Sequence, residues 1–155
     1  MYGISKKSKY GLRALFALAR SYGQGPILIA DLARNARIPK KFLELILLEL
    51  RNKGILASKK GKGGGYFLAR DPNGITVGEV IRALDGSLAP VPCVSQTAYR
   101  RCEECDDERT CGIRAVMQDA RDATAKVLDS ESLAALLKRE ELLDQKKRKV
   151  LVYAI

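Results

Sequence analysis

The fold is decided by residues 39–69, which read PKKFLELILLELRNKGILASKKGKGGGYFLA. In the first part, residues 39–53, apolar side chains recur at helical spacing, and Gly54 follows as a residue typical of a helix end. In the second part, residues 55–69, two short apolar runs flank a glycine-rich turn, which is typical of a β-hairpin. The stretch therefore predicts a helix followed by a hairpin.

The helix predicted at 39–53 should bury one face and expose the other. Pro39 suits its first helical position, because the proline ring fixes φ near a helical value and the missing N–H would have no partner there. The apolar stripe expected to be buried consists of Leu43, Ile46, Leu47 and Leu50.

Two further helices are predicted upstream, at 8–22 and 29–36. The helices at 29–36 and 39–53 have the spacing of a helix-turn-helix unit, whose second helix enters the major groove of DNA. Helix spacing alone would fit another small helical bundle equally well. The hairpin that follows favours a winged helix, with the hairpin as its wing.

The predicted wing has strands at 55–60 and 66–69 and a turn at 61–65. Glycines in the turn allow positive φ values and let backbone N–H groups approach a phosphate, while the lysines supply positive charge. A nucleotide-binding P-loop is excluded, because a strand and not a helix follows the glycines. A flexible surface hairpin without a ligand is the alternative. The wing residues expected to contact DNA are Lys59, Lys60, Lys62, Gly63, Gly64 and Tyr66.

Positive charge is concentrated in the half of the chain that contains this pattern. The 155-residue chain carries a net charge of +10, but residues 1–70 hold 15 Lys and Arg against three Asp and Glu, whereas residues 71–155 hold 13 against 15. A polyanion such as double-stranded DNA is therefore the expected partner of the first half. A basic surface that is simply solvated is the alternative.

Composition also bears on the compartment and on the chemistry. No run approaches the about 20 apolar residues of a membrane span, and the first residues lack the apolar core of a secretory signal. We therefore expect a cytoplasmic protein without a membrane partner. The chain has no His, the commonest general base, so we do not expect an enzyme.

The cysteines lie in a segment without periodicity, residues 87–111, which follows a predicted helix. Thr76 and Glu79 have the spacing of a capping box at the start of that helix, which is expected to end near Leu84. A loop as long as 87–111 needs something other than an apolar core to order it, and a metal centre is such an organiser. The cysteine spacing is Cys93-x8-Cys102-x2-Cys105-x5-Cys111.

Four thiolates suffice to hold an iron-sulfur cluster within one chain, and a 2Fe-2S cluster is preferred here over 4Fe-4S. A reducing cytosol also favours metal-bound or free thiols over structural disulfides. Zinc is the alternative metal, although structural zinc sites usually pair two short Cys-x2-Cys knuckles and this chain has one. A thiol-disulfide switch without metal is a further alternative, because nearby arginines lower the pKa of a thiol.

A long amphipathic helix is predicted from Gly112 onward, and its apolar face could form a homodimer or pack within the chain. A short helix is expected at Leu133–Leu137, followed by a solvated tail. The side chains expected at the dimer interface are Ile113, Val116, Met117, Ala120, Thr124 and Val127.

Together these patterns predict a mainly α protein with a small β-hairpin. Its expected parts are a winged helix-turn-helix domain at 1–86, a cluster-binding loop at 87–111, a dimerisation region at 112–137 and a tail at 138–155.

Three features resemble the iron-sulfur cluster regulator (IscR) and nitrite-sensitive repressor (NsrR) family of winged-helix transcription regulators. They are the wing Gly61–Tyr66, the segment TVGEVIRALDG at 76–86 and the cysteine loop, and the resemblance covers residues 1 to about 137. It implies a bacterial homodimer that binds palindromic promoter DNA and reports iron, nitric oxide or redox status through a cluster. Other members of the family lack the cluster and respond to cysteine metabolism.

The resemblance also implies roles for single residues. Lys40, Lys41, Phe42 and Glu44 match the groove-facing start of the recognition helix, and Lys60 matches a basic wing residue that enters the minor groove. A carboxylate such as that of Glu44 can accept a hydrogen bond from cytosine but is repelled by phosphate, so it could change sequence preference with the state of the cluster.

The cysteine loop departs from the family pattern. Family members usually have three cysteines with five residues in each gap, whereas here only Cys105 and Cys111 keep that gap and Cys102 is additional. Arg114 and the Ser8-Lys9 region stand where the family's fourth ligand is found, and neither Arg nor Lys ligates iron well. Cys102 is therefore expected to be the fourth ligand, in an all-thiolate site with a lower reduction potential than a site with His ligands.

Two other classes of function fit part of this pattern. One is a basic RNA- or ribosome-associated protein with a structural zinc site. The other is an electron-carrying enzyme that uses the same cluster, which the lack of any second acid-base constellation disfavours.

Overall fold

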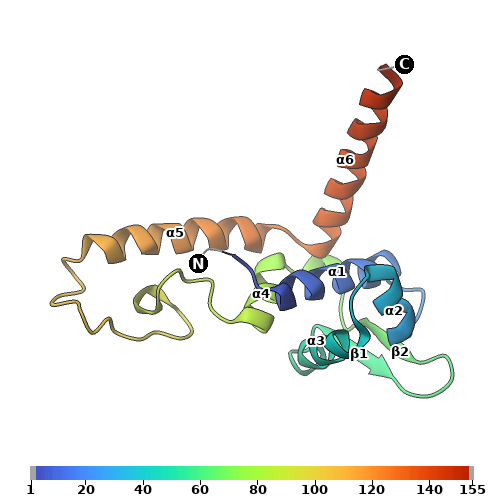
Figure 1. The fold of residues 1–155 in the computed structure, drawn as a ribbon, viewed down its shortest axis with the longest axis horizontal. Coiled ribbons are helices and arrows are strands. Elements are labelled where there is room, and N and C mark those ends of the chain that lie inside the picture. Colours follow the sequence, from blue (N-terminus) through green and yellow to red (C-terminus); the bar gives the residue numbers. More distant parts are fainter. Residues whose placement is uncertain (1–2, 154–155) are drawn as a thin grey trace.

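The computed structural model describes residues 3–153, with side chains described to residue 149. Three helices open the chain: α1 at Lys6–Arg20, α2 at Ile29–Ala36 and α3 at Lys40–Asn52 (Figure 1). The helix α1 starts two residues before its predicted start, because the hydroxyl of Ser5 caps it by accepting a hydrogen bond from the N–H of Ser8 at 3.1 Å.

The turn between α2 and α3 is short and well bonded. Arg37 adopts a left-handed conformation with φ 53°, and the N–H of Ile38 donates to the carbonyl of Ala33 at 2.9 Å. Pro39 is the N-cap of α3 and not its first helical residue, so its predicted place is wrong by one position. The proline ring allows both positions, because its fixed φ is compatible with an extended residue as well as a helical one.

The predicted hairpin is present as two antiparallel strands, β1 at Leu56–Lys59 and β2 at Gly65–Leu68. Leu56 lies opposite Leu68, and Lys59 lies opposite Gly65. A single bridge adds Ile27 beside Tyr66, with backbone hydrogen bonds of 2.9 Å in both directions. The segment before α2 therefore holds the wing against the helices.

The 3-10 helix η1 (Pro72–Gly74) and the helix α4 (Val77–Asp85) follow the wing. Thr76 caps α4 as predicted, and its hydroxyl accepts a hydrogen bond from the N–H of Glu79 at 3.1 Å. The second hydrogen bond of a capping box, from the backbone N–H of Thr76 to the carboxylate of Glu79, is not formed. Glu79 instead forms an ion pair with Arg70.

One apolar core joins these elements. The predicted stripe of α3, formed by Leu43, Ile46, Leu47 and Leu50, is completely buried, which confirms that prediction. Leu15 of α1, Leu32 of α2 and Val80 of α4 are equally buried in the same cluster.

Beyond the core the chain is extended. The cysteine loop contains the 3-10 helix η2 (Pro92–Val94) and leads into the long helix α5 (Gly112–Ser130), and together they project to one side of the core in Figure 1. The junction after α5 returns to the core, where the N–H of Val77 donates to the carbonyl of Glu131 at 2.9 Å.

The last helix, α6, spans Leu133–Tyr153 and stands out from the body of the molecule (Figure 1). Its first residue, Leu133, is completely buried in the core. The prediction that this helix ends at Leu137 is wrong. Residues 138–153 contain no Gly or Pro to stop it, and ion pairs such as Asp144 with Arg148 at 2.9 Å support an exposed helix.

The predicted fold class is confirmed: the structure is mainly helical with one two-stranded hairpin in its described residues. Among those residues, no helix combines the length and the apolar character needed to cross a lipid bilayer.

Candidate DNA-binding surface and cysteine pocket

The start of α3 exposes charged side chains. Lys40, Lys41 and Glu44 are all exposed, as a groove-reading helix requires. Leu45 is also exposed, over 66% of its surface, and Leu48 over 41%. Sequence reasoning did not select these two leucines, although their position outside the buried stripe of α3 could have revealed them.

Phe42 has a different surrounding from its exposed neighbours. It is half-buried, and its ring meets the ring of Tyr10 edge-on, with 5.6 Å between the centroids. The side chain of Phe42 therefore helps to hold α3 against α1. Tyr10 is itself faced by the cations of Lys6 and Arg13, at 5.8 and 5.9 Å from its ring centroid.

The wing exposes the three lysines predicted for it, Lys59, Lys60 and Lys62. Gly61 and Gly63 have φ values of 89° and 73°, so the predicted need for positive φ is met at these two positions. The wing lies beside α3 at the end of the molecule opposite the cysteine loop (Figure 1).

Gly64 and Tyr66, also predicted to contact DNA, have packing roles in the wing. A Cβ atom on Gly64 would lie 2.2 Å from the carbonyl oxygen of Lys59, and the N–H of Gly64 already donates to Gly61 at 3.0 Å. Gly64 is buried and Tyr66 is half-buried, with its backbone N–H and carbonyl bonded to Ile27. Gly64 and Tyr66 therefore shape the wing, whereas Gly63 remains exposed at its tip.

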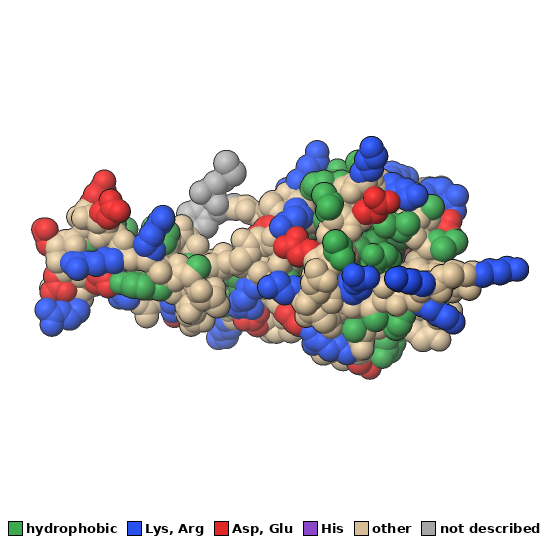
Figure 2. All heavy atoms as spheres, turned by 90° about the horizontal axis from the view of Figure 1, so that it is seen from below, with side chains coloured by type: hydrophobic (Ala, Val, Ile, Leu, Met, Phe, Trp, Pro, Cys, Tyr) green, Lys and Arg blue, Asp and Glu red, His purple; other side chains and the backbone are tan. Residues whose placement is uncertain are grey.

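The two ends of the molecule differ in surface charge. Figure 2 shows more Lys and Arg than acidic side chains at the winged-helix end, with apolar side chains between them, whereas at the far end of the cysteine loop acidic side chains gather beside a few Lys and Arg. This distribution agrees with the charge difference between residues 1–70 and 71–155 of the sequence.

The cysteine loop and the start of α5 line an open cavity of about 770 Å³. All four cysteines line this cavity: Cys93, Cys102, Cys105 and Cys111. They differ in exposure, because Cys93 is buried in η2, Cys102 is exposed and the other two are half-buried.

Cys105 and Cys111 are in contact. Desolvation and donation of its S–H to Cys111 raise the pKa of Cys105. Cys111 is the N-cap of α5, and its sulfur accepts a hydrogen bond from the N–H of Arg114 at 3.4 Å. That hydrogen bond is the main cause of a lowered pKa at Cys111, since it stabilises the thiolate.

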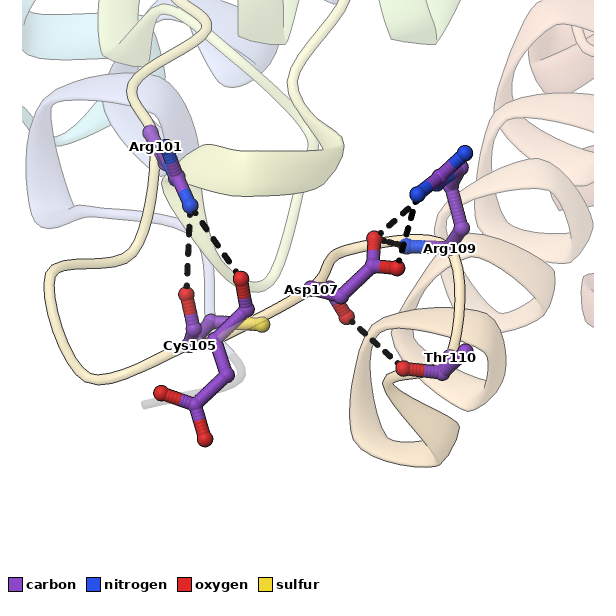
Figure 3. A network of polar contacts seen from close by, with 6 residues as sticks. Arg101, Cys105, Asp107, Arg109 and Thr110 are labelled. Atoms are coloured by element: carbon purple, nitrogen blue, oxygen red, sulfur yellow. Dashed lines mark hydrogen bonds and ion pairs between the residues drawn. The ribbon is translucent and has the colours of Figure 1, made fainter.

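Polar contacts hold the loop around these cysteines. Arg101 donates to the carbonyls of Cys105 and Asp106 at 3.5 and 3.3 Å, and Arg109 pairs with Asp107 (Figure 3). A further contact, the Tyr99–Glu108 hydrogen bond, joins residues on either side of the Cys102–Cys105 segment. The hydroxyl of Tyr99 lies 2.9 Å from both carboxylate oxygens of Glu108. The sequence did not predict this hydrogen bond.

The four cysteine side chains that line the cavity suit an iron-sulfur cluster or a zinc ion, since iron in such clusters and zinc both bind thiolates. Among the described residues, however, no three Cys, Asp or Glu side chains lie close enough together to form a metal site. The four cysteines thus share one cavity, and their joint ligation remains a prediction.

The helix α5 leaves its apolar face uncovered within one chain. None of its residues is buried, and Ile113, Val116 and Val127 are exposed over 72%, 62% and 62% of their surface. Of the other residues predicted for a dimer interface, Met117 and Ala120 are half-buried and Thr124 is exposed.

Contacts with η2 and with α4 connect α5 to the rest of the molecule. Near its middle, Arg121 donates a hydrogen bond to the carbonyl of Val94 at 2.5 Å, which ties α5 to η2. At its end, Asp129 accepts two hydrogen bonds of 2.7 Å from Arg82 of α4. Asp129 lies so close to Gly78 that a Cβ atom there would come within 2.0 Å of its oxygen.

Comparison with known proteins gives consistent matches to regulators of transcription. Residues 4–139 match the Rrf2 family, which is described as iron-dependent transcriptional regulators. An rrf2-like HTH-type transcriptional regulator of Rhodobacter capsulatus is 39% identical over 137 residues, which is 86% of this chain and 91% of that protein.

Two solved structures share the fold over most of both chains. CymR, the global cysteine regulator of B. subtilis, superposes with a TM-score of 0.74 at 34% identity, covering 90% of this chain and 98% of its own. IscR of T. potens gives a TM-score of 0.69 at 31% identity, covering 89% of this chain and 88% of its own.

Proposed function

Because the chain belongs to the Rrf2 family of transcriptional regulators, we propose that it binds promoter DNA as a homodimer and that an iron-sulfur cluster on its cysteine loop sets the affinity. Family membership confirms the predicted resemblance, and relatives named as regulators confirm that the chain is not an enzyme.

The proposed DNA contact is supported above all by the shared exposure of lysines on α3 and on the wing. Lys40 and Lys41 open α3, and Lys59, Lys60 and Lys62 surround the wing tip. In a dimer, the two α3 helices would enter successive major grooves about 34–36 Å apart, and each wing would contact the flanking backbone.

Salt dependence tests this proposal. Fluorescence anisotropy with a labelled palindromic duplex should give a log-log slope against salt that falls by about one when Lys60 or Lys62 is replaced by alanine, because each phosphate contact releases about one counterion. Lys126→Ala on α5 is the matched control, since Lys126 is exposed outside the winged helix. Duplex binding that does not depend on salt, or an equal effect of Lys126→Ala, would contradict the proposal.

In the cysteine loop, Cys93, Cys102, Cys105 and Cys111 would hold the cluster. When bound, a cluster supplies a redox-active and nitric-oxide-reactive centre. The chain's own part is to transmit the state of the loop: Cys111 caps α5, and Asp129 at the other end of α5 is bonded to Arg82 of α4. A coupling of about 1–3 kcal/mol would change DNA affinity by roughly 5–150-fold.

Cys102 is the decisive ligand to test, because it is the cysteine outside the family spacing. In anaerobically purified protein, Cys102→Ala should lose iron or show an altered visible spectrum. Cys102→Ala protein with an unchanged spectrum and unchanged cluster stability would remove Cys102 from the ligand set.

Glu44 is proposed to couple the cluster to sequence preference. Its exposed carboxylate on α3 can accept from a cytosine amino group, so a small movement of α3 would change which base pair is favoured. Operator preference measured with and without the cluster should differ for the wild type and not for Glu44→Ala. A preference of Glu44→Ala that still changes with the cluster would end this assignment.

A second candidate function is cluster-free regulation of cysteine metabolism, favoured by the TM-score of 0.74 to a global cysteine regulator. Iron, sulfide and zinc analysis of anaerobically purified protein distinguishes the two functions. Stoichiometric iron and sulfide support cluster sensing, and their absence supports the second candidate.

A further inference from the structure

Arg114, in the first turn of α5, has an unusual place in the wall of the cysteine cavity. Its Nε atom is shielded from solvent and has no hydrogen-bond partner. Among the described residues, no acidic side chain forms an ion pair with its guanidinium. Buried N–H donors are nearly always paired in folded proteins, so the guanidinium of Arg114 has hydrogen-bonding capacity that no described residue uses.

Of the three arginines in the cysteine loop, Arg100 is exposed, and Arg101 and Arg109 have side-chain partners. Arg101 donates to two backbone carbonyls, and Arg109 forms an ion pair with Asp107 while 89% of its side chain is exposed. Arg114 differs from both, because its backbone N–H is bonded to the sulfur of Cys111 and its side chain lines the cavity.

The charge around the cavity defines the acceptor. The lining includes four thiols and five acidic residues between Glu103 and Glu108, against the basic residues Arg100, Arg101 and Arg114. A cluster with four thiolate ligands would therefore add negative charge where acidic side chains already outnumber basic ones. An arginine stays protonated at all relevant pH values and carries several N–H donors, which makes it suited to compensate such a charge.

We propose that Arg114 donates a hydrogen bond from its guanidinium to a sulfur atom of the bound cluster, a role that rests on the proposed function. Arg114 is thus a positioning and tuning residue and not a ligand. A positive donor stabilises the more negative, reduced state, because reduction potentials respond to net charge and to hydrogen bonds at sulfur. It should therefore raise the potential of the site and retard loss of the cluster.

The experiment compares the wild type with Arg114→Met, Arg114→Lys and the control Arg109→Met, all full-length and purified anaerobically. Midpoint potentials come from optical redox titration, and cluster stability from the rate of bleaching by an iron chelator. Arg109→Met also removes one positive charge, but in the loop and at a side chain that is exposed and paired with Asp107.

We expect Arg114→Met to lower the equilibrium constant for one-electron reduction about tenfold, which corresponds to about 59 mV. Chelator bleaching should become several-fold faster, Arg114→Lys should restore part of both changes, and Arg109→Met should match the wild type. If Arg114→Met loses its cluster during purification while its thermal unfolding is unchanged, that loss also supports the role. The potential is then measured on Arg114→Lys, where it should lie below that of the wild type.

Two results would overturn the inference in distinguishable ways. A wild type that keeps its cluster, with Arg114→Met equal to Arg109→Met in potential and bleaching rate, refutes the role of Arg114 alone. A wild type without iron and sulfide refutes the proposed cluster and this inference with it.

Discussion

In residues 3–86 side chains from six helices and strands meet in one apolar core, whereas residues 87–111 bury only Cys93, Val94 and Ser95. The winged helix is ordered by burial of leucine and isoleucine side chains, which needs no ligand. The cysteine loop is ordered by contacts such as Tyr99 with Glu108 and Arg101 with Cys105. The proposed DNA binding and the proposed sensing are therefore assigned to parts that differ in how much apolar core orders them.

The largest expected effect is a loss of stability when the apolar core of the winged helix is disturbed. Leu47→Ala should lower the free energy of unfolding by about 2–5 kcal/mol, because Leu47 is completely buried and its removal leaves a cavity. Urea unfolding of metal-free protein, followed by circular dichroism, measures this value.

Cys105→Ala is the counterpart in the loop for the same measurement. Cys105 is half-buried outside the core, so we expect a change within about 0.5 kcal/mol in metal-free protein. A loss of stability in Cys105→Ala as large as in Leu47→Ala would show that the loop, too, is stabilised by its own packing.

The next effect concerns the uncovered apolar face of α5, which lies outside both the winged-helix core and the cysteine loop. Val116→Asp should raise the dimer dissociation constant about 100-fold, because two charges would be buried without partners at a symmetric interface. Light scattering over a range of protein concentrations measures the change. Ala115→Asp is the control, since Ala115 is exposed on the opposite side of α5. An unchanged dimer in Val116→Asp would remove this face from the interface.

The same comparison explains how much the sequence could predict. The buried stripe of α3 and the hairpin follow from periodicity, because both depend on apolar spacing and turn residues that are local in the sequence. The end of α6 was missed because residues 138–149 form an exposed helix, and such helices carry no apolar stripe to recognise.

Pairings within the candidate sites were beyond sequence reasoning for a different reason. Four cysteines on one loop could be selected by residue type, and the structure brings all four to one cavity. Other features depend on neighbours that are distant in the sequence or set by the local fold. They are the contact of Phe42 with Tyr10, the hydrogen bond of Tyr99 to Glu108 and the unpaired Nε of Arg114. No periodicity encodes such neighbours.

A smaller effect on stability and DNA binding is expected for a glycine in the wing. Gly64→Ala should cost about 1–3 kcal/mol of stability and weaken DNA binding, because its Cβ atom would overlap the carbonyl oxygens of Lys59 and Gly61. Gly74→Ala is the control, since nothing lies within 4 Å of a Cβ atom there. Anisotropy titration and thermal unfolding measure both effects, and equal behaviour of the two variants would contradict the packing role of Gly64.

The smallest effect tests the junction between the two parts, where Arg82 of α4 meets Asp129 of α5. The hydrogen bonds from Arg82 hold the pKa of Asp129 below its ordinary value, although desolvation opposes them. Asp129 therefore stabilises the fold above the pKa of an unfolded Asp, about 3.9, and this contribution disappears as the pH falls through the lower pKa of the folded state. Because both side chains are partly exposed, we expect only about 0.5–1 kcal/mol.

Urea unfolding of the wild type and Asp129→Asn from pH 7 to pH 2.5 measures this contribution. The two proteins should differ at pH 7 and converge at the acid end, where Asp129 of the wild type is protonated and no longer ion-paired. Asp119→Asn, an exposed position on the same helix without an ion pair among the described side chains, should show no such convergence. A difference that stays constant down to pH 2.5 would mean that Asp129 acts through packing against Gly78 and not through its charge.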